Sequence, residues 1–171
     1  MVAFVLSATL ALFSHSSAHQ ARTAHSSGHL PVKGLIVPGI SFAGLKIGYT
    51  QQQVRSLWGS NFVECKYCTD VTWLYEYRGS EPLGAAVRFQ KNKVVAMFSL
   101  GSPAGWHTDK GLFMGDPIAN VYQFFPSTGT TRCIGFDAVT ARTGKVVTAF
   151  YSAAGVIYGF AIVIPTMTVC Q

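Results

Sequence analysis

The sequence is poor in charged residues, and poorest in acidic ones. Charged side chains make up 12% of the 171 residues, and only seven residues are Asp or Glu. Hydrophobic residues make up 49%, so the chain is too apolar for disorder and too weakly charged for a long solvated helical protein. The acidic residues are scattered and form no paired motif, which argues against an enzyme that uses two carboxylates.

The apolar run at the N terminus is too short to cross a membrane. It covers residues 2–13, which is 12 residues, whereas a membrane-spanning helix needs about 20. No Lys or Arg precedes the run, but small residues at Ser16 and Ala18 fit the site that a signal peptidase cuts. We therefore predict a signal peptide at residues 1–18 and a protein that is secreted or associated with the cell envelope. No cysteine directly follows the run, so no lipid anchor is predicted.

Residues 19–37 lack an apolar period and are predicted to be a flexible N-terminal segment. His15, His19, His25 and His29 could suggest a metal site, because short His-rich tracts can bind transition metals. His15 would leave with the signal peptide, and nothing visible in the sequence holds the other three in one coordination geometry. We predict no metal and no cofactor.

The basic residues outnumber the acidic ones but are not clustered. The formal net charge is +6, which would favour acidic partners. The Lys and Arg residues are spread singly along the chain, without a nucleic-acid-binding motif. The predicted partner is a protein, the alternative is an acidic polymer of the cell envelope, and nucleic acid is not expected.

The chain contains one internal repeat. Residues 44–50 (GLKIGYT) align with residues 111–117 (GLFMGDP), and the apolar residues that follow align as Val54 with Val121, Leu57 with Phe124 and Trp58 with Phe125. We therefore predict an α+β fold of two tandem repeats, residues 38–103 and 104–171. Each repeat is expected to be a short helix packed on a three-stranded antiparallel meander.

Capping residues and alternation indicate the expected helices and strands. Thr50 and Gln53 have the spacing of a capping box, and Asp116 before Pro117 is the expected N-cap of the second helix. Period-two patterns predict strands at residues 71–78, 84–90, 94–100, 133–140, 145–152 and 156–164. Trp106, in the segment between the repeats, is expected to pack over their junction.

Strict alternation along these strands leaves a second apolar sheet face opposite the helices. The C-terminal tail at residues 166–171, the other repeat or a partner protein could each cover it. We predict that part of this face binds a protein, at a surface bordered by five residues: Arg88, Met97, Val147, Tyr151 and Ile157.

The motif at residues 47–55 (IGYTQQQVR), followed by Leu57 and Gly59, resembles the entry motif of the SmpA/OmlA (BamE-like) lipoproteins. Tyr49 stands where that family usually has Met. The tandem pattern is also similar to the β-lactamase inhibitory proteins, which are secreted binders. These resemblances imply a helix-on-sheet fold that acts through protein contacts without a cofactor.

The four cysteines are predicted to form two structural disulfides. Cys65 and Cys68 form a CxxC motif, which is also compatible with a redox pair or half of a zinc site. A redox pair normally begins a helix, but a strand is expected here, and Cys133 and Cys170 are isolated in sequence. Three pairings exist, and we favour Cys65 with Cys68 and Cys133 with Cys170.

A single short segment brings together residue types that are used in hydrolysis. Residues 106–109 read Trp-His-Thr-Asp, but neighbours in sequence seldom converge on one reacting atom. We therefore predict a secreted, non-enzymatic protein-binding module. The alternatives are a structural component of the cell envelope and, less favoured, a hydrolase or a thiol-redox enzyme.

Overall fold

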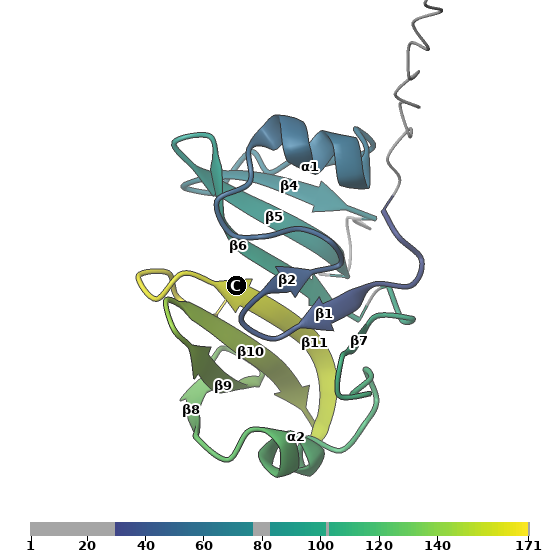
Figure 1. The fold of residues 1–171 in the computed structure, drawn as a ribbon, viewed down its shortest axis with the longest axis vertical. Coiled ribbons are helices and arrows are strands. Elements are labelled where there is room, and N and C mark those ends of the chain that lie inside the picture. Colours follow the sequence, from purple (N-terminus) through teal and green to yellow (C-terminus); the bar gives the residue numbers. More distant parts are fainter. Residues whose placement is uncertain (1–29, 77–82, 102, 171) are drawn as a thin grey trace, which may run out of the picture.

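The computed structural model describes residues 30–76, 83–101 and 103–170, and most of its secondary structure is β. One large sheet contains eight antiparallel strands (Figure 1). In sheet order they are β3 (Val63–Glu64), β4 (Val71–Tyr75), β5 (Gly84–Gln90), β6 (Lys93–Leu100), β11 (Val156–Val163), β10 (Val146–Ala153), β9 (Asp137–Thr143) and β8 (Thr128–Arg132).

The predicted α+β fold of two helix-on-meander repeats is wrong. Strands β6 and β11 pair directly, from Gly159 opposite Leu100 to Val163 opposite Ala96, so the strands form one continuous sheet. Strands β3 and β8 extend this sheet at its two edges and were not predicted, because neither has an alternating apolar pattern. Pairing β6 with β11 satisfies backbone groups that two separate meanders would leave at free edges.

The other strand predictions succeeded to different degrees. Strands β5, β6, β10 and β11 confirm the predicted segments 84–90, 94–100, 145–152 and 156–164 to within about one residue. The segment 133–140 is a correction, because residues 133–136 form a turn and β9 begins only at Asp137. The predicted signal peptide and the four histidines at 15, 19, 25 and 29 lie outside the described residues.

Helix α1 (Gln51–Trp58) begins at the predicted capping box. The Thr50 N–H donates to Gln53 Oε1 at 2.8 Å, and the Gln53 N–H donates to Thr50 Oγ1 at 3.2 Å. Gly59 ends the helix at φ 81°, a conformation that glycine adopts without steric cost. Val54 and Trp58 are buried against the sheet.

Helix α2 (Ala119–Phe124) begins differently from the prediction. Its N-cap is Ile118, and Asp116 lies too far upstream to cap it. Asp116 Oδ2 instead accepts a 2.8 Å hydrogen bond from the Phe113 N–H and closes the preceding turn. The Asp-Pro pair was therefore a turn signal rather than a cap.

A second, small sheet joins segments that are far apart in the chain. It contains β1 (Leu35–Val37), which pairs antiparallel with β2 (Ser41–Phe42) and parallel with β7 (His107–Thr108). Strand β1 lies inside the segment 19–37 that was expected to be flexible. Ile36 in β1 is fully buried, and its burial accounts for the order of this strand.

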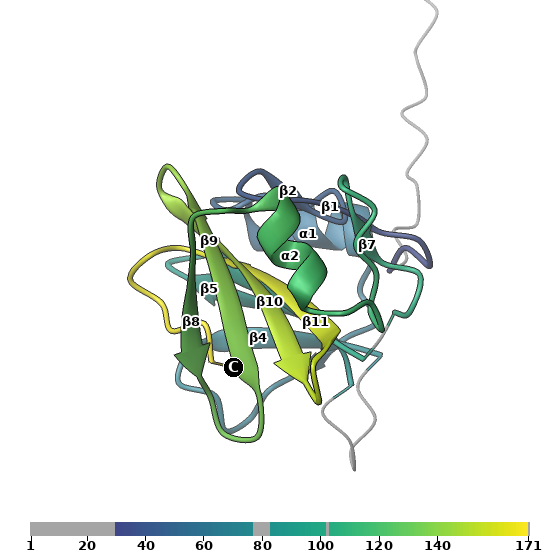
Figure 2. The same cartoon turned by 90° about the horizontal axis from the view of Figure 1, so that it is seen from below.

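Both helices and the small sheet lie over the same face of the large sheet (Figure 2). Their apolar side chains form the helix-side core, in which Trp58 contacts Tyr75 and Trp106 in edge-to-face geometry, each at 5.3 Å between ring centroids. Trp106 is completely buried, and its Nε1–H donates to the Pro31 carbonyl at 2.7 Å. Within the described residues, no helix is long and apolar enough to cross a membrane.

Candidate functional site

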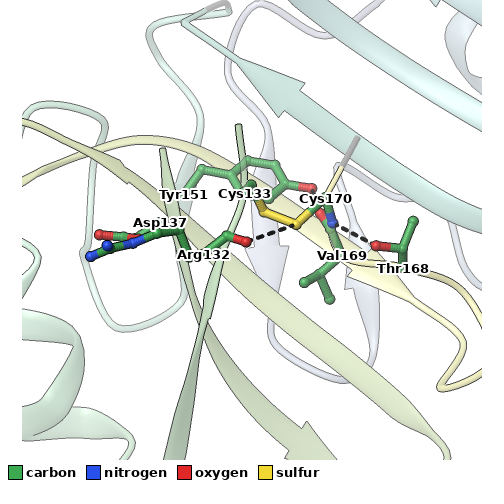
Figure 3. The surroundings of a disulfide bond; sticks show 7 residues. All are labelled: Arg132, Cys133, Asp137, Tyr151, Thr168, Val169 and Cys170. Carbon is green, nitrogen blue, oxygen red and sulfur yellow. Dashed lines mark hydrogen bonds and ion pairs between the residues drawn. A yellow bond between two sulfur atoms is a disulfide. The ribbon is translucent and has the colours of Figure 1, made fainter. Parts of the chain in front are cut away.

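Both disulfides have the favoured pairing. Cys65 is bonded to Cys68 and Cys133 to Cys170, with Cα–Cα distances of 5.6 and 5.4 Å, as is normal for disulfides. The first bond closes a loop within one edge hairpin of the sheet. The second bond ties the turn between β8 and β9 to the C-terminal tail (Figure 3).

The five residues predicted to border a protein-binding surface do not form one. Met97 and Ile157 are fully buried in the helix-side core, on the face opposite to the one predicted. Tyr151 lies on the predicted face but is also fully buried. Arg88 and Val147 are half-buried. The predicted surface is therefore corrected, because three of its five members are inaccessible to a partner.

Two bulges explain why the faces were assigned wrongly. Opposite β5, the register moves from Arg88–Ala96 to Phe89–Val94, so Val95 is an extra residue in β6. Opposite β10, Tyr158 is an extra residue in β11, between Ile157 and Gly159. One extra residue in a strand reverses which face the side chains beyond it occupy. Met97 and Ile157 therefore point to the helix side.

The C-terminal tail, residues 164–170, covers part of the second sheet face. The tail begins where the Ile164 N–H donates to the Val95 carbonyl at 3.0 Å, and its end is fixed by the disulfide at Cys170. Met167 and Val169 pack on the apolar cluster of this face, which contains Ala96, Leu100, Ala138, Ala149, Tyr151, Ala161 and Val163. Of the three candidate covers, the tail is thus the one that lies over Tyr151.

Tyr151 links the tail to the sheet through its hydroxyl. The Tyr151 O–H donates to the Val169 carbonyl at 2.8 Å, and Phe136 packs edge-to-face on the Tyr151 ring at 5.2 Å. Burial raises the pKa of the Tyr151 hydroxyl far above its ordinary value; Tyr158 adds to this shift and Arg88 opposes it. The hydroxyl therefore stays protonated and keeps its hydrogen bond throughout the physiological pH range.

The most exposed large hydrophobic side chain of the described residues is Ile134, in the turn that the second disulfide fixes. Ile134 is 99% exposed, although the turn around it is held on both sides. The Cys133 N–H donates to the Phe136 carbonyl at 2.9 Å, and Cys133 is bonded to Cys170. We call residues 132–137 together with Cys170 the disulfide corner. Because the backbone of this turn is already fixed, a partner that covers Ile134 would have little further chain to order.

A hollow of about 320 Å³ lies at the disulfide corner. It is lined by Arg132, Cys133, Gly135, Phe136, Asp137, Ser152, Ala153 and Ala154. The Arg132 Nε lies 3.4 Å from Asp137 Oδ1, and both side chains extend away from the disulfide (Figure 3). The corner therefore offers an exposed apolar group, a charged pair and a concave surface within one turn.

The first disulfide also holds an exposed hydrophobic residue. Tyr67 lies between Cys65 and Cys68 and is 98% exposed. This loop belongs to the hairpin of β3 and β4, at the sheet edge opposite β8. Tyr67 and Ile134 therefore lie in separate regions of the molecule, and the hollow lies beside Ile134.

The segment from Trp106 to Asp109 has local structural contacts. His107 stacks on Phe113 with ring centroids 4.7 Å apart, and its Nδ1 lies 3.2 Å from the Gly105 carbonyl. The Thr108 hydroxyl is buried and accepts hydrogen bonds from the backbone of Lys110 and Leu112. Asp109 faces the Lys110 ammonium group at 3.8 Å.

Sequence reasoning missed Ile134 and β8. The segment 133–140 was interpreted as a strand, which placed Ile134 inside a sheet instead of at a turn. The usable signals were Gly135 after Ile134, which is typical of a turn, and the β-branched run of threonines before Cys133.

The chain was compared with known proteins. No family model matches it, and no curated protein matches its sequence. Among solved structures, it is similar to an extracellular protein containing an SCP domain from Bacillus anthracis, with a TM-score of 0.50 and 12% sequence identity. The match covers 70% of this chain and 44% of that one, and at this identity it shows the fold alone. The resemblance to the SmpA/OmlA and inhibitory-protein families stays a prediction.

Proposed function

We propose that this chain is an extracellular protein-binding module that contacts its partner through the disulfide corner. The observation that carries the proposal is the 99% exposure of Ile134 in a turn fixed by a disulfide and a backbone hydrogen bond. Burying such a side chain is worth about 1.5–3 kcal/mol. Because the turn is already rigid, little conformational entropy is lost when a partner covers it.

The hollow beside Ile134 supports the same assignment. Its volume of about 320 Å³ is enough to receive a side chain of a partner, and its rim carries the Arg132–Asp137 pair, which can orient a polar group. Binding hot spots combine an apolar anchor with a neighbouring pocket and charged groups at the rim.

An extracellular location is supported by the two disulfides, which are characteristic of exported proteins. The extracellular origin of the similar solved structure agrees with it. A role in binding rather than catalysis is supported by residues 107–109, whose side chains are engaged in stacking, hydrogen bonds and an ion pair.

The test compares two variants that remove the same side chain at different places. Ile134→Ser removes the anchor of the disulfide corner, and Ile40→Ser removes an isoleucine that is 58% exposed beside the small sheet. A partner is first isolated from the extracellular proteins of the native source with the wild-type chain as bait. Its dissociation constant is then measured by calorimetry for the wild type and for both variants.

We expect Ile134→Ser to weaken binding at least about 30-fold, the effect of losing one hot-spot side chain, and Ile40→Ser to leave it unchanged. Equal melting temperatures of the three proteins would show that the fold is intact. Failure to isolate any saturable partner would contradict the proposal, as would equal affinity of the Ile134→Ser variant.

A further inference from the structure

Strand β8 forms one edge of the large sheet, and its outer side has no strand beside it among the described residues (Figure 2). Hydrogen-bonded and non-hydrogen-bonded residue pairs alternate along two antiparallel strands. The hydrogen bond from the Cys133 N–H to the Phe136 carbonyl shows which pairs of β8 and β9 are of which kind. It makes Arg132 and Asp137 a non-hydrogen-bonded pair, so the backbone groups of Thr130 and Thr128 point away from β9. The Arg132 carbonyl lies 3.9 Å from Cys170 Sγ, which leaves Thr128 to Thr131 as the open stretch.

Apart from Arg132 at its end, this edge lacks the features by which sheet edges usually avoid pairing. Its sequence, TGTTR, contains no Pro and no Lys, and its register with β9 runs without a bulge over all five residues. The opposite edge strand, β3, has only two residues. An unprotected edge of five residues is a ready template for one further strand.

The charges around β8 select the kind of strand that it can accept. From Thr128 to Cys170 the chain has three basic residues, Arg132, Arg142 and Lys145, and one acidic residue, Asp137. Asp137 already faces Arg132. Because Thr128 pairs with Ala141, Arg142 lies next to the start of β8, and Arg132 ends it. Arg142 therefore makes the Thr128 end of the open edge positive, whereas at the other end Asp137 balances the charge of Arg132.

These charges also disfavour a second copy of the chain as the added strand. Antiparallel pairing of two β8 strands about Thr130 would place Arg132 of one copy opposite Thr128 of the other. Each copy also carries a formal net charge of +6. Two chains of the same net charge repel each other, whereas an acidic segment is attracted.

We propose that β8 binds an extended acidic segment of a partner protein as a ninth strand of the sheet. The backbone of Thr128 and Thr130 supplies the hydrogen bonds, and Arg142 and Lys145 attract the carboxylates. The added strand leads to the hollow beside Ile134, since Arg132 ends β8 and lines that hollow. This inference rests on the proposed function and names the chemistry of the partner at the same site.

The test uses the intact oxidised chain and three capped synthetic peptides. The probe peptide alternates Glu and Val. The first control replaces each Glu by Lys. The second keeps Glu but carries an N-methyl group on every amide, so that neither of its edges can pair with a strand. Binding is measured by fluorescence anisotropy at low salt, and exchange of the backbone amides by nuclear magnetic resonance.

We expect the Glu–Val peptide to bind, and both control peptides to bind at least about tenfold more weakly. Saturation with the Glu–Val peptide should slow exchange of the Thr128 and Thr130 amides at least about tenfold. The amides of Gly129 and Thr131, which already face β9, should not change. Equal binding of the N-methylated peptide, or unchanged exchange at Thr130, would overturn the proposal.

A pair of variants tests the protein side of the same contact. Thr130→Pro removes an N–H that points away from β9 and so breaks no hydrogen bond within the sheet, while Thr130→Ala keeps that N–H. We expect Thr130→Pro to weaken peptide binding about tenfold and Thr130→Ala to bind like the wild type. If Thr130→Pro does not fold, the N-methylated peptide and the amide exchange decide the question alone.

The outcomes separate this inference from the proposed function. If Ile134→Ser abolishes binding of the isolated partner while the Thr130 amide stays unprotected in that complex, the binding module stands and the ninth strand is wrong. Concentration-dependent dimers in sedimentation that Thr130→Pro abolishes would instead assign the edge to a second copy and overturn the acidic partner.

Discussion

The hydroxyl of Tyr151 donates a 2.8 Å hydrogen bond to the backbone carbonyl of Val169. This bond holds the C-terminal tail against the second face of the sheet, one residue before the tail is bonded to Cys133. Because Tyr151 is fully buried, its hydroxyl is kept neutral, and burial raises its pKa far above the ordinary value. The tail is thus fixed by one covalent bond and one hydrogen bond in consecutive residues.

The raised pKa of Tyr151 predicts alkaline destabilisation. A group whose pKa is higher in the folded state adds stability that is complete below its unfolded value, about 10 for Tyr. That stability is lost as the pH rises above about 10 toward the folded value. Denaturant titrations between about pH 8 and pH 11 should therefore show the free energy of unfolding falling at the alkaline end.

Tyr151→Phe should make this alkaline loss smaller, while it costs about 1–2 kcal/mol at neutral pH because the Val169 carbonyl loses its donor. Some loss should remain, since burial also raises the pKa of Tyr75. An identical alkaline slope in the wild type and the Phe variant would show that Tyr151 ionises freely in the folded protein.

The two disulfides should stabilise the chain unequally. They join cysteines separated by 3 and by 37 positions, and closing the longer loop removes more entropy from the unfolded chain. Replacing Cys133 and Cys170 by Ser should cost about 4 kcal/mol, against about 2 kcal/mol for the Cys65 and Cys68 pair. Chemical denaturation of both double variants beside the wild type measures the difference.

Hydrogen exchange of the backbone amides of the same two double variants tests whether the second disulfide holds the tail. Without the bond at Cys170 the tail is released, so the amides of residues 164–170 should lose protection while those of α1 keep theirs. The variant that lacks Cys65 and Cys68 is the control, in which the tail should stay protected. Equal protection of the tail in both double variants would mean that the disulfide does not hold it.

At Gly159, near the centre of the sheet, we expect that any side chain would destabilise the fold. It lies at the pairing of β6 with β11, and a Cβ there would clash with the Ser99 carbonyl oxygen and approach Tyr151 Cδ2 to 3.1 Å. Gly159→Ala should therefore cost about 2 kcal/mol or more, because backbone cannot move aside as a side chain can.

Gly129→Ala is the matched control, since that Cβ would meet only the Thr140 hydroxyl at 3.3 Å at the exposed edge. It should change the free energy of unfolding by less than about 0.5 kcal/mol. Similar unfolding midpoints for the two alanine variants would refute the idea that the two halves of the sheet meet too closely for a side chain at Gly159.

The sequence predicted local features well because their causes are local. The capping box at Thr50 and Gln53 depends on two side chains three residues apart, and it formed as expected. The disulfides followed from the spacing of the cysteines and the expected compartment. Four of the six strands were confirmed within about a residue, because their alternation is strong.

The faces of the strands could not be predicted, because they depend on the register between strands. A single extra residue at Val95 or Tyr158 moves Met97 or Ile157 to the other face, and the local sequence does not mark either position as a bulge. The direct pairing of β6 with β11, and hence the single large sheet, depends on contacts between residues 59 to 67 positions apart. No period within one segment contains that information.

The candidate site was missed for a related reason. Strand β8 is exposed along most of its length and lacks apolar alternation, so it gives no periodic signal. Ile134 was placed inside a strand, because the segment 133–140 was predicted to be one. Its exposure became evident only when the turn at residues 133–136 was placed.

The order of the cysteines along the chain has a consequence for how the disulfides form. A chain is made from its N terminus, so Cys65 and Cys68 are available first and can join at once across their short loop. The partner of Cys133 is Cys170, which lies 37 positions further along the chain and is made later. If the early pair closes first, Cys133 meets no competing thiol during that interval. We therefore expect the short CxxC ring to remove two wrong partners before the last segment arrives, so that the correct pairing forms with little reshuffling.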